Sequence, residues 1–356
     1  MSFSLEITAR CNNNCRHCYV NLPADNIEAQ KKELNFAQIG DIALQARSLG
    51  VVWCLITGGE PLLRPDFFEI YLYLKKKGFL TSVFTNATLV TQKHISFFKK
   101  YPPRDLEVTV YGVTQETYEK VTRRKGSFSA FMRGLNLLLA NGLKVRLKAM
   151  ALRSNVDELS EIARFCRRHT KDYFRFDPLL HLRFDGNRKR NEEIKSERLS
   201  PKEIVAIEQQ DSERSEALRK GCDKLINPQF EHYGCDHLFH CGTGQGSFYV
   251  SYGGSFKLCS SLSHPDCIYD LKKGLVEEAC LGFVPNVRNM RSENKEFLNR
   301  CDRCEIINLC LWCPAHSHLE TGRLDSPVEY FCQVAHARAK AITGLSALNY
   351  DSSIGK

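Results

Sequence analysis

Residues 4–19 read SLEITARCNNNCRHCY, in which a strand pattern runs directly into a polar loop with three cysteines. Their spacing is C-x3-C-x2-C, and the three residues are Cys11, Cys15 and Cys18. Three thiolates are one short of a closed tetrahedral zinc site or of a fully ligated [4Fe–4S] cluster. A cluster with three protein ligands leaves one iron open to a small molecule. We therefore expect this loop to hold either an open iron–sulfur cluster or a zinc ion that takes a fourth ligand such as His17.

The composition is that of an ordinary globular protein. The chain has 356 residues, a net charge of +9, 43% hydrophobic and 26% charged side chains, which excludes disorder, collagen and coiled coil. No apolar run approaches the roughly 18 residues of a membrane span, and Met1–Arg10 does not have the pattern of a signal peptide. We therefore expect a cytoplasmic protein with no membrane association. In a reducing compartment its 16 cysteines indicate metal binding or redox chemistry rather than disulfides.

The basic residues do not form a nucleic-acid footprint. The run Arg188–Arg190 alternates with Glu192, Glu193 and Glu197, a pattern typical of a solvated helix face. A nucleic-acid surface would instead show a basic stripe interleaved with aromatic residues. We expect no nucleic-acid partner.

The first half of the chain alternates short apolar runs with amphipathic stretches. Strands are predicted at Ser4–Thr8, Val51–Thr57, Phe79–Thr85, Leu106–Tyr111, Lys144–Ala151 and Tyr173–Phe176. Helices are predicted between them at Phe36–Ser48, Phe67–Lys77, Gln92–Lys100, Phe128–Ala140 and Val156–His169. Repeated βα units predict a parallel sheet or barrel with ligands at the carboxyl ends of the strands.

The composition of the sequence changes after this alternating region. We expect an α/β domain over residues 1–200, a bridging helical segment over 201–230, a small cysteine-rich α+β domain over 231–345 and a tail over 346–356. Residues 242–258 (GTGQGSFYVSYGGSFKL) carry hairpin signals. Because the third region is poor in long apolar runs, metal binding is expected to stabilise it more than a hydrophobic core does.

The turn after the second predicted strand links the cysteine loop to a known family. Gly58, Gly59, Glu60 and Pro61 read GGEP, and C-x3-C-x2-C followed by GGEP resembles the radical S-adenosylmethionine (SAM) superfamily over about residues 4–176. The resemblance implies a partial (βα)6 TIM-like barrel in which SAM chelates the open iron. It also implies that these four residues bind SAM. The glycines would let the backbone approach the methionyl ammonium, and Glu60 would supply negative charge nearby.

The same resemblance assigns further SAM contacts. Asn86, in the TNAT sequence that ends the third strand, matches a position where many members have TNG. Thr109 on the fourth strand matches a residue that meets the SAM ribose, and Tyr19 matches an aromatic residue beside the adenine. Many members also carry an arginine that reaches the SAM carboxylate, but Arg123 and Arg124 do not align cleanly with it.

A second cysteine set follows the predicted barrel. Its spacings are C-x5-C-x12-G-x4-C from Cys235 to Cys259, then C-x2-C-x5-C-x2-C from Cys301 to Cys313, with Cys332 farther on. Eight thiolates make two sets of four, enough for two fully ligated clusters or two structural zinc ions.

Behind a radical SAM domain this spacing resembles the SPASM extension. The resemblance implies two auxiliary [4Fe–4S] clusters, one held by Cys235, Cys241, Cys259 and Cys313, the other by Cys301, Cys304, Cys310 and Cys332. The last pair departs from the family, since only Leu311 and Trp312 separate its cysteines where three residues are usual.

Together these features predict a radical SAM enzyme with SAM and three [4Fe–4S] clusters. It would cleave SAM to a 5′-deoxyadenosyl radical and remove a hydrogen from a peptide or protein, leading to oxidation, a crosslink or epimerisation. Asp177, after the sixth strand, is the candidate acid or base. Flavodoxin or ferredoxin is the expected electron donor. Because Cys11 lies so close to Met1, we expect no leader-binding domain before it, so that a separate protein delivers the substrate or the enzyme recognises a short segment.

Two other functions remain open from the sequence. One is a radical SAM enzyme that acts on a small-molecule metabolite. The other is a zinc-stabilised binding protein without catalytic activity.

Overall fold

The computed structural model describes residues 1–171, 174–220, 236–302 and 304–343. The chain divides into two compact units. Unit 1 comprises Met1–Arg198 and Cys241–Arg288, and unit 2 comprises Leu199–His240 and Asn289–Lys356. Cys235, a predicted cluster ligand, lies outside the described residues.

Unit 1 is built on a nine-stranded sheet with the order β11-β10-β9-β1-β4-β5-β6-β7-β8. Six of these strands run parallel from β1 to β8. They are β1 (Ser2–Thr8), β4 (Trp53–Gly58), β5 (Leu80–Thr85), β6 (Leu106–Val110), β7 (Val145–Met150) and β8 (Arg175–Asp177). This arrangement confirms the predicted partial (βα)6 barrel.

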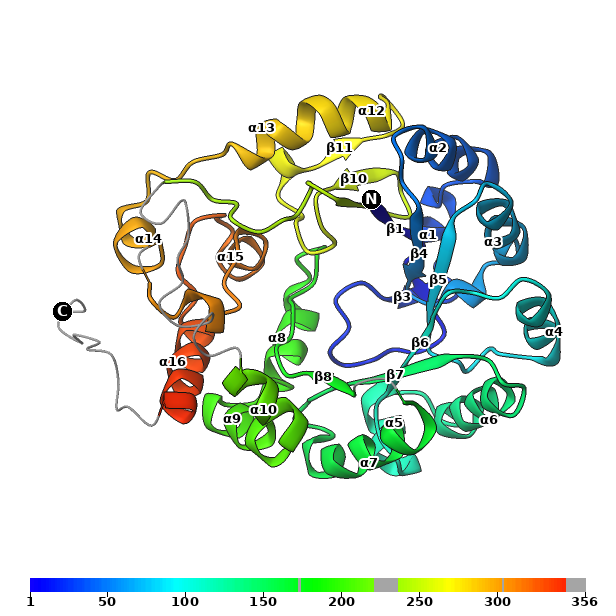
Figure 1. Ribbon diagram of the computed structural model, residues 1–356, viewed down its shortest axis with the longest axis horizontal. Helices are drawn as coiled ribbons and strands as arrows, with labels where there is room; N and C mark the ends of the chain where they lie inside the picture. Colours follow the sequence, from blue (N-terminus) through cyan, green and yellow to red (C-terminus); the bar gives the residue numbers. More distant parts are fainter. Residues whose placement is uncertain (172–173, 221–235, 303, 344–356) are drawn as a thin grey trace. The chain divides into compact units, whose positions relative to one another are not determined.

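Helices lie outside the curved sheet and connect its strands (Figure 1). They are α2 (Phe36–Ser48), α3 (Phe67–Lys76), α4 (Gln92–Lys100), α6 (Ser127–Ala140) and α7 (Leu159–His169). Helix α5 (Gln115–Thr122) was not predicted, because its only buried residues are Tyr118, Val121 and Thr122, too few to produce a clear helical period. Two further short elements, α1 (Ile27–Lys32) and α8 (Arg188–Ser196), are mostly polar.

Strand alternation decides which side chains enter the barrel. In β6, Leu106, Val108 and Val110 are buried in the core. Their neighbours Glu107 and Thr109 point to the other face, where they line a cavity. Successive strand residues point to opposite faces, so polar residues at alternate positions mark the interior of the barrel.

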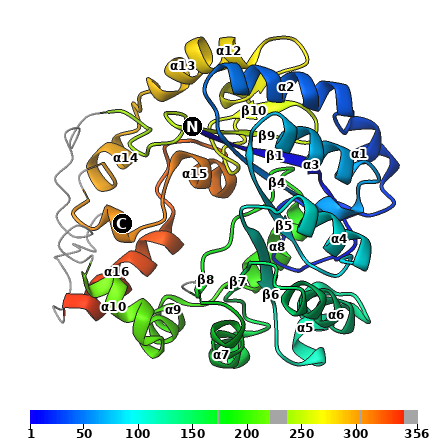
Figure 2. The same ribbon diagram turned by 45° about the vertical axis from the view of Figure 1, so that its right-hand side comes forward.

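The predicted hairpin forms, and it joins the barrel sheet (Figure 2). Strands β9 (Ser247–Val250) and β10 (Ser255–Lys257) are antiparallel to each other, and β9 pairs in parallel with β1. The short strand β11 (Tyr269–Asp270) completes this side. The pairing covers a β1 edge that would otherwise expose unpaired backbone groups. Residues 241–288, expected in the third domain, thus pack with the barrel, followed by α12 (Val276–Glu278), a π-helical turn (Ala279–Phe283) and α13 (Val284–Arg288).

Unit 2 is mainly helical. It contains α9 (Pro201–Gln210), α10 (Ser212–Lys220), α14 (Lys295–Arg300), α15 (Pro314–Thr321) and α16 (Glu329–Thr343). A small cluster of Ile306, Leu309, Ala335 and Ala339 forms an apolar centre against which Cys304 and Cys310 pack. In the part of the chain that the structure describes, no helix is both long enough and apolar enough to cross a membrane.

Candidate functional site

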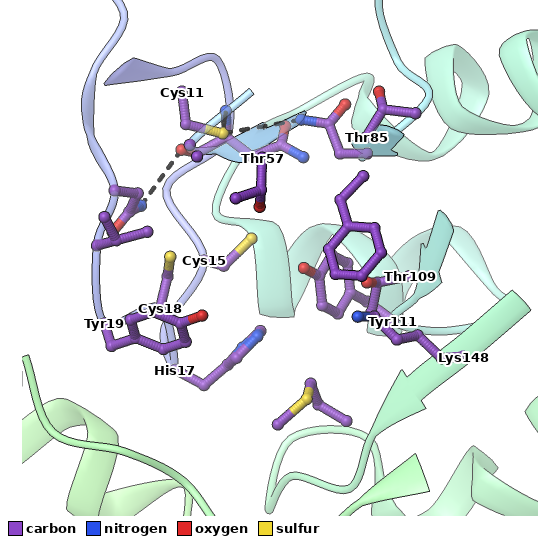
Figure 3. A pocket seen from close by; sticks show the side chains of 18 of the residues that line it. Cys11, Cys15, His17, Cys18, Tyr19, Thr57, Thr85, Thr109, Tyr111 and Lys148 are labelled. Carbon is purple, nitrogen blue, oxygen red and sulfur yellow. Dashed lines mark hydrogen bonds between the residues drawn. The ribbon is translucent and has the colours of Figure 1, made fainter. Parts of the chain in front are cut away.

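A cavity of about 190 Å³ opens inside the barrel of unit 1, between the cysteine loop and strands β4 to β7 (Figure 3). Most of the predicted site residues of the barrel line it: Cys11, Cys15, Cys18, Tyr19, Gly58, Gly59, Asn86 and Thr109. Glu60, Pro61 and Asp177 are not among its lining residues. Residues that are far apart in sequence are thus brought to one place at the carboxyl ends of the strands.

The three thiols of the first motif point toward one another at one end of the cavity (Figure 3). Burial, with smaller contributions from Glu60 and Cys18, raises the pKa of Cys11 to about 12. Burial, followed by the neighbouring thiols of Cys18 and Cys11, holds the pKa of Cys15 well above its usual value. Without a cation Cys11 and Cys15 therefore stay protonated at neutral pH, and metal binding must release their protons.

The end of α5 holds the cysteine loop by its backbone. Asn14 N–H donates to Thr122 O at 2.9 Å, and Arg16 N–H donates to Val121 O at 3.0 Å. The loop therefore satisfies two carbonyls of the last turn of α5, which a helix cannot bond internally. The helix that the sequence did not reveal is part of the cluster-binding scaffold.

Two arginines clamp the other side of the loop. Arg183 Nη1 donates to Cys18 O at 3.3 Å and to Asn21 O at 3.1 Å, while its guanidinium also pairs with Asp185. Arg190 Nη2 donates to Cys15 O at 2.8 Å. Charge-assisted bonds of this kind are the stronger class of hydrogen bond.

The interpretation of residues 188–197 as a solvated face is therefore wrong for its inward side. Arg190 and Glu193 form an ion pair of 2.8 Å, Glu193 also binds Arg123, and Glu197 is buried at 4% exposure. Arg188 and Glu192 remain exposed, as the pattern indicated. Alternating charges mark a helix surface, but they do not reveal whether a loop from elsewhere in the chain covers it.

The two glycines of the GGEP turn lie against the strand that leads into the cysteine loop. A Cβ on Gly58 would stand 2.1 Å from Thr8 O, and one on Gly59 would stand 2.4 Å from Arg10 O. Gly58 also has φ +137°, which side chains rarely adopt. Gly59 N–H donates to Thr8 O at 2.7 Å. Only glycine allows this close backbone contact, and the same contact places the turn beside the three thiols.

Glu60 is not among the residues that line the cavity, and it connects the turn after β4 to the end of β5. Its carboxylate accepts hydrogen bonds from Thr85 Oγ1 at 2.8 Å, from Asn86 N–H at 2.7 Å and from Leu62 N–H at 3.0 Å. The residue is fully buried, and burial raises its pKa to about 7. Pro61 starts the short 3-10 turn (Pro61–Leu63) that Glu60 caps. The predicted electrostatic role of Glu60 toward SAM remains a prediction.

Asn86 connects the end of β5 to the cysteine loop. Its Nδ2 donates to Asn12 Oδ1 at 2.9 Å and to Cys11 Sγ at 3.7 Å. Thr88 closes a ring of hydrogen bonds, because Asn12 Nδ2 donates to Thr88 Oγ1 at 2.8 Å and Thr88 Oγ1 donates to Asn86 Oδ1 at 2.6 Å. The TNAT sequence thus fixes the loop around the first cysteine.

Several residues that line the cavity were not assigned to it from the sequence, and four of them form two pairs. His17 and Tyr111 bring their rings within 5.2 Å of each other, and Glu107 forms an ion pair with Lys148. Burial lowers the pKa of His17 to about 4, so the imidazole is neutral at pH 7. Glu107 and Lys148 are polar residues at alternate positions of β6 and β7, and this pattern in the sequence could have placed them inside the barrel. His17 was considered only as a zinc ligand.

The remaining candidates of unit 1 have different environments. Asp177 is about half exposed, and Arg175 lies 3.8 Å away. Its neighbour His181, near Tyr19, does line the cavity. Arg123 pairs with Glu193 at 2.8 Å, whereas Arg124 Nη1 is buried with no hydrogen-bond partner among the described residues.

In unit 2, four cysteines surround one pocket. We call Cys301, Cys304, Cys310 and Cys332 the closed thiol set. Trp312 N–H donates to Cys310 Sγ at 3.4 Å, and Arg300 Nη2 donates to Cys332 Sγ at 3.7 Å. Burial, followed by neighbouring thiols of the set, raises the pKa of Cys301 to about 12.

The other predicted auxiliary set includes Cys235, so its assembly remains a prediction. Cys241 and Cys259 both belong to unit 1, where Arg288 Nη1 donates to Cys241 O at 2.8 Å. Cys313 belongs to unit 2, caps α15 and accepts a hydrogen bond from His316 N–H at 3.4 Å.

The donor chemistry of both described thiol groups fits iron–sulfur clusters. Thiolates are the ligands of such clusters, with three at the barrel cavity and four in the closed thiol set. At the cavity, both side-chain polar atoms of Asn13 and the Nδ1 of His17 are buried with no hydrogen-bond partner among the described residues. A polar group in the cavity would satisfy these atoms. Among the described residues, no three His, Cys, Asp or Glu side chains converge tightly enough for a single metal ion.

A parallel partial barrel with three thiols and a glycine turn at one cavity defines a class of barrel proteins that bind a metal cofactor. Residues 5–166 match the radical SAM superfamily model.

Two curated relatives each align with less than half of the chain. The subtilosin biosynthesis protein AlbA of Bacillus subtilis is 30% identical over 168 residues, which are 46% of this chain and 36% of AlbA. Fe-coproporphyrin III synthase of Methanosarcina barkeri is 33% identical over 159 residues, covering 44% of this chain and 38% of the relative. The chain thus spans less than two fifths of the length of these relatives.

A solved structure extends the likeness in fold to the rest of the chain. It is native anSMEcpe with bound AdoMet and Kp18Cys peptide, with a TM-score of 0.64, 14% identity and coverage of 96% of this chain and 97% of that one. The likeness in fold to this structure therefore covers nearly the whole chain.

Proposed function

We propose that this protein is a radical SAM enzyme that modifies a peptide or protein. The observation that carries the proposal is the set of three thiols, two of them buried, that line the barrel cavity together with Gly58 and Gly59. When bound there, an iron–sulfur cluster with SAM supplies a 5′-deoxyadenosyl radical that removes a hydrogen from an unactivated carbon.

The protein's own residues hold, orient and shield this chemistry. Cys11, Cys15 and Cys18 bind the cluster, and the backbone of Gly58 and Gly59 meets the amino-acid end of SAM. Thr109 and Tyr19, which line the cavity, bind the ribose and adenine as the family resemblance implies. The paired rings of His17 and Tyr111 offer a further aromatic wall for the adenine. The barrel walls would limit the access of water to the reacting carbon.

We propose Arg124, which does not itself line the cavity, rather than Arg123 as the partner of the SAM carboxylate. Its Nη1 is buried with no hydrogen-bond partner among the described residues. A buried guanidinium N–H without an acceptor is costly, and a bound carboxylate would supply that acceptor. Arg123, in contrast, is already paired with Glu193.

We further propose two auxiliary [4Fe–4S] clusters. The closed thiol set would hold one, and Cys235, Cys241, Cys259 and Cys313 the other. Fully ligated clusters cannot bind a substrate without losing a cysteine, so electron transfer is their proposed role. The electron donor would be a flavodoxin or ferredoxin. Thiols in such number stay reduced in the cytoplasm, where we propose that the enzyme works.

Both a relative in sequence and a relative in structure support a peptide substrate. AlbA is a bacteriocin biosynthesis protein, and the solved anSMEcpe structure contains a peptide beside AdoMet. The similarity to Fe-coproporphyrin III synthase favours a small-molecule substrate as the second candidate. Asp177 and His181 at the mouth of the barrel are the proposed proton-transfer candidates, and His181 is the one that lines the cavity.

The test is anaerobic reconstitution with iron and sulfide, followed by SAM cleavage with dithionite. We expect about twelve iron and twelve sulfide per chain, since each of three clusters has four of each, and release of 5′-deoxyadenosine that is lost in Cys15→Ala. A colourless, zinc-containing protein without SAM cleavage would overturn the proposal. Mass spectrometry of peptides and tetrapyrroles incubated with the enzyme then separates the two substrate classes.

A further inference from the structure

Arg300 contacts the closed thiol set directly. It is the last residue of α14, next to Cys301, and its Nη2 donates a hydrogen bond to Cys332 Sγ at 3.7 Å. The guanidinium also lines the pocket that the four thiols surround. A permanent positive charge therefore lies against one ligand sulfur of the set.

Two carboxylates hold Arg300 in this position from the outer side. Arg300 Nη2 forms an ion pair with Glu329, and Arg300 Nη1 lies 3.6 Å from Glu296. The side chains of Glu329 and Glu296 are 57% and 64% exposed, while that of Arg300 is 26% exposed. Water screens the two carboxylates more than it screens the guanidinium, so they orient the arginine without cancelling its effect on the sulfur.

We propose that Arg300 is a positioning residue that raises the reduction potential of the auxiliary cluster on the closed thiol set, through its hydrogen bond to Cys332. This inference rests on the proposed function in one respect only, that a [4Fe–4S] cluster binds these four cysteines. It adds a residue that sets how readily that cluster accepts an electron.

The sign of the effect follows from the charges. Reduction adds one electron, supplied by dithionite in the test below, and makes the cluster and its thiolates more negative. A positively charged donor at a ligand sulfur stabilises this reduced form more than the oxidised form. Hydrogen bonds to the sulfurs and net charge are recognised determinants of cluster potentials. Removing the donor must therefore lower the potential.

The experiment uses the full chain with Cys11, Cys15 and Cys18 replaced by alanine, which removes the first cluster and leaves the auxiliary sites. After anaerobic reconstitution, a dithionite titration followed by electron paramagnetic resonance measures the midpoint potentials. The signal that disappears in Cys301→Ala/Cys304→Ala belongs to the closed thiol set. Arg323→Gln is the matched control, because Arg323 lies in the same unit, pairs with Asp325 at 3.2 Å and is 65% exposed.

Arg300→Gln is expected to raise the ratio of oxidised to reduced cluster about tenfold at a fixed potential, a shift of about 59 mV for a one-electron couple. Arg300→Lys keeps the charge but not the fixed fork of donors, and should fall between Arg300→Gln and the unsubstituted chain. Arg323→Gln should leave the potential unchanged.

An intact cluster signal with an unchanged midpoint in Arg300→Gln overturns this inference and leaves the proposed function standing. Failure of the triple-alanine chain to bind iron overturns the auxiliary clusters and the inference together. If Arg300→Gln loses its cluster, the midpoint potential of Arg300→Lys tests the proposal instead. A lowered midpoint there supports the proposal, and an unchanged one overturns it.

Discussion

Glu60 accepts a hydrogen bond from Thr85 Oγ1 at 2.8 Å, and this contact ties the turn after β4 to the end of β5. Asn86, the next residue, donates its N–H to the same carboxylate and its side-chain amide to Cys11 Sγ. One buried acid therefore connects the glycine turn with the loop that carries the first thiol. Its main effect within unit 1 is to hold the cavity wall in place.

The raised pKa of Glu60 predicts a pH-dependent contribution to stability. Burial raises its pKa from 4.5 to about 7, so the folded protein binds the proton more tightly than the unfolded chain. The stability associated with this group is complete below pH 4.5 and is lost as pH rises through 7. The shift corresponds to a few kcal/mol, about 1.4 for each pKa unit.

Glu60→Gln should remove this dependence. Urea unfolding of both proteins between pH 5 and pH 8 is the measurement, and the variant should show a flatter profile than the parent. Gln presents an amide N–H to donors that need an acceptor, so it should also be less stable at every pH in the series. Parallel pH profiles for the two proteins would contradict the assignment.

The glycine turn predicts intolerance to a single methyl group. Gly59→Ala would place a Cβ 2.4 Å from Arg10 O, a contact that can be relieved only by moving the backbone beside the cysteine loop. Such clashes destabilise proteins by about 1–3 kcal/mol or more. We expect a lower melting temperature and loss of SAM binding in equilibrium dialysis. Gly282→Ala is the control, because nothing lies within 4 Å of its Cβ, and it should behave like the parent.

The arginine clamp predicts a defect in cluster retention. Arg183→Gln removes the charged donor to Cys18 O and Asn21 O, and each such bond contributes roughly 1.5–3 kcal/mol. Iron should leave the first site faster when a chelator is added to the reconstituted protein, as followed by the visible absorbance. The exposed Arg188 provides the comparison, and Arg188→Gln should keep the parent rate. Equal rates for Arg183→Gln and the parent would refute the clamp.

A buried ion pair predicts the largest effect on the stability of unit 2. Arg338 and Glu208 bind each other through two hydrogen bonds of 2.8 and 3.0 Å, and their side chains are 7% and 2% exposed. Arg338→Met leaves the Glu208 carboxylate buried with one arginine fewer, and loss of one partner from a buried pair costs about 3–5 kcal/mol. Arg338 also donates to Leu309 O, the residue before Cys310, so the variant should loosen the closed thiol set.

Thermal unfolding of the reconstituted protein measures this effect. The exposed pair Lys220–Glu216 in the same unit is the control, and Lys220→Ala should leave the unfolding transition where it is. A transition in Arg338→Met that coincides with that of Lys220→Ala would show that the buried pair does not support the fold.

Local sequence patterns were sufficient to predict most strands and helices of the barrel. The strand at Ser2–Thr8 and the helix at Phe36–Ser48 have clear periodicity and capping, and their predicted bounds agree with the structure within about two residues. Helix α5 was missed because its few buried residues produce too weak a period. The lumen residues Glu107 and Lys148 were visible as strand alternation, but their meeting in one ion pair depends on the register of β6 and β7.

The order and spacing of residues along the chain determined the alternation of strands and helices, the three-thiol loop and the glycine turn, because backbone periodicity and ligand spacing are local properties. Only the tertiary structure decided that α5 and the arginines at 183 and 190 hold that loop, and that the β9–β10 hairpin extends the barrel sheet beside β1. These contacts join residues more than a hundred positions apart. Their choice of partner is made by the packing of the whole unit, which no local pattern encodes.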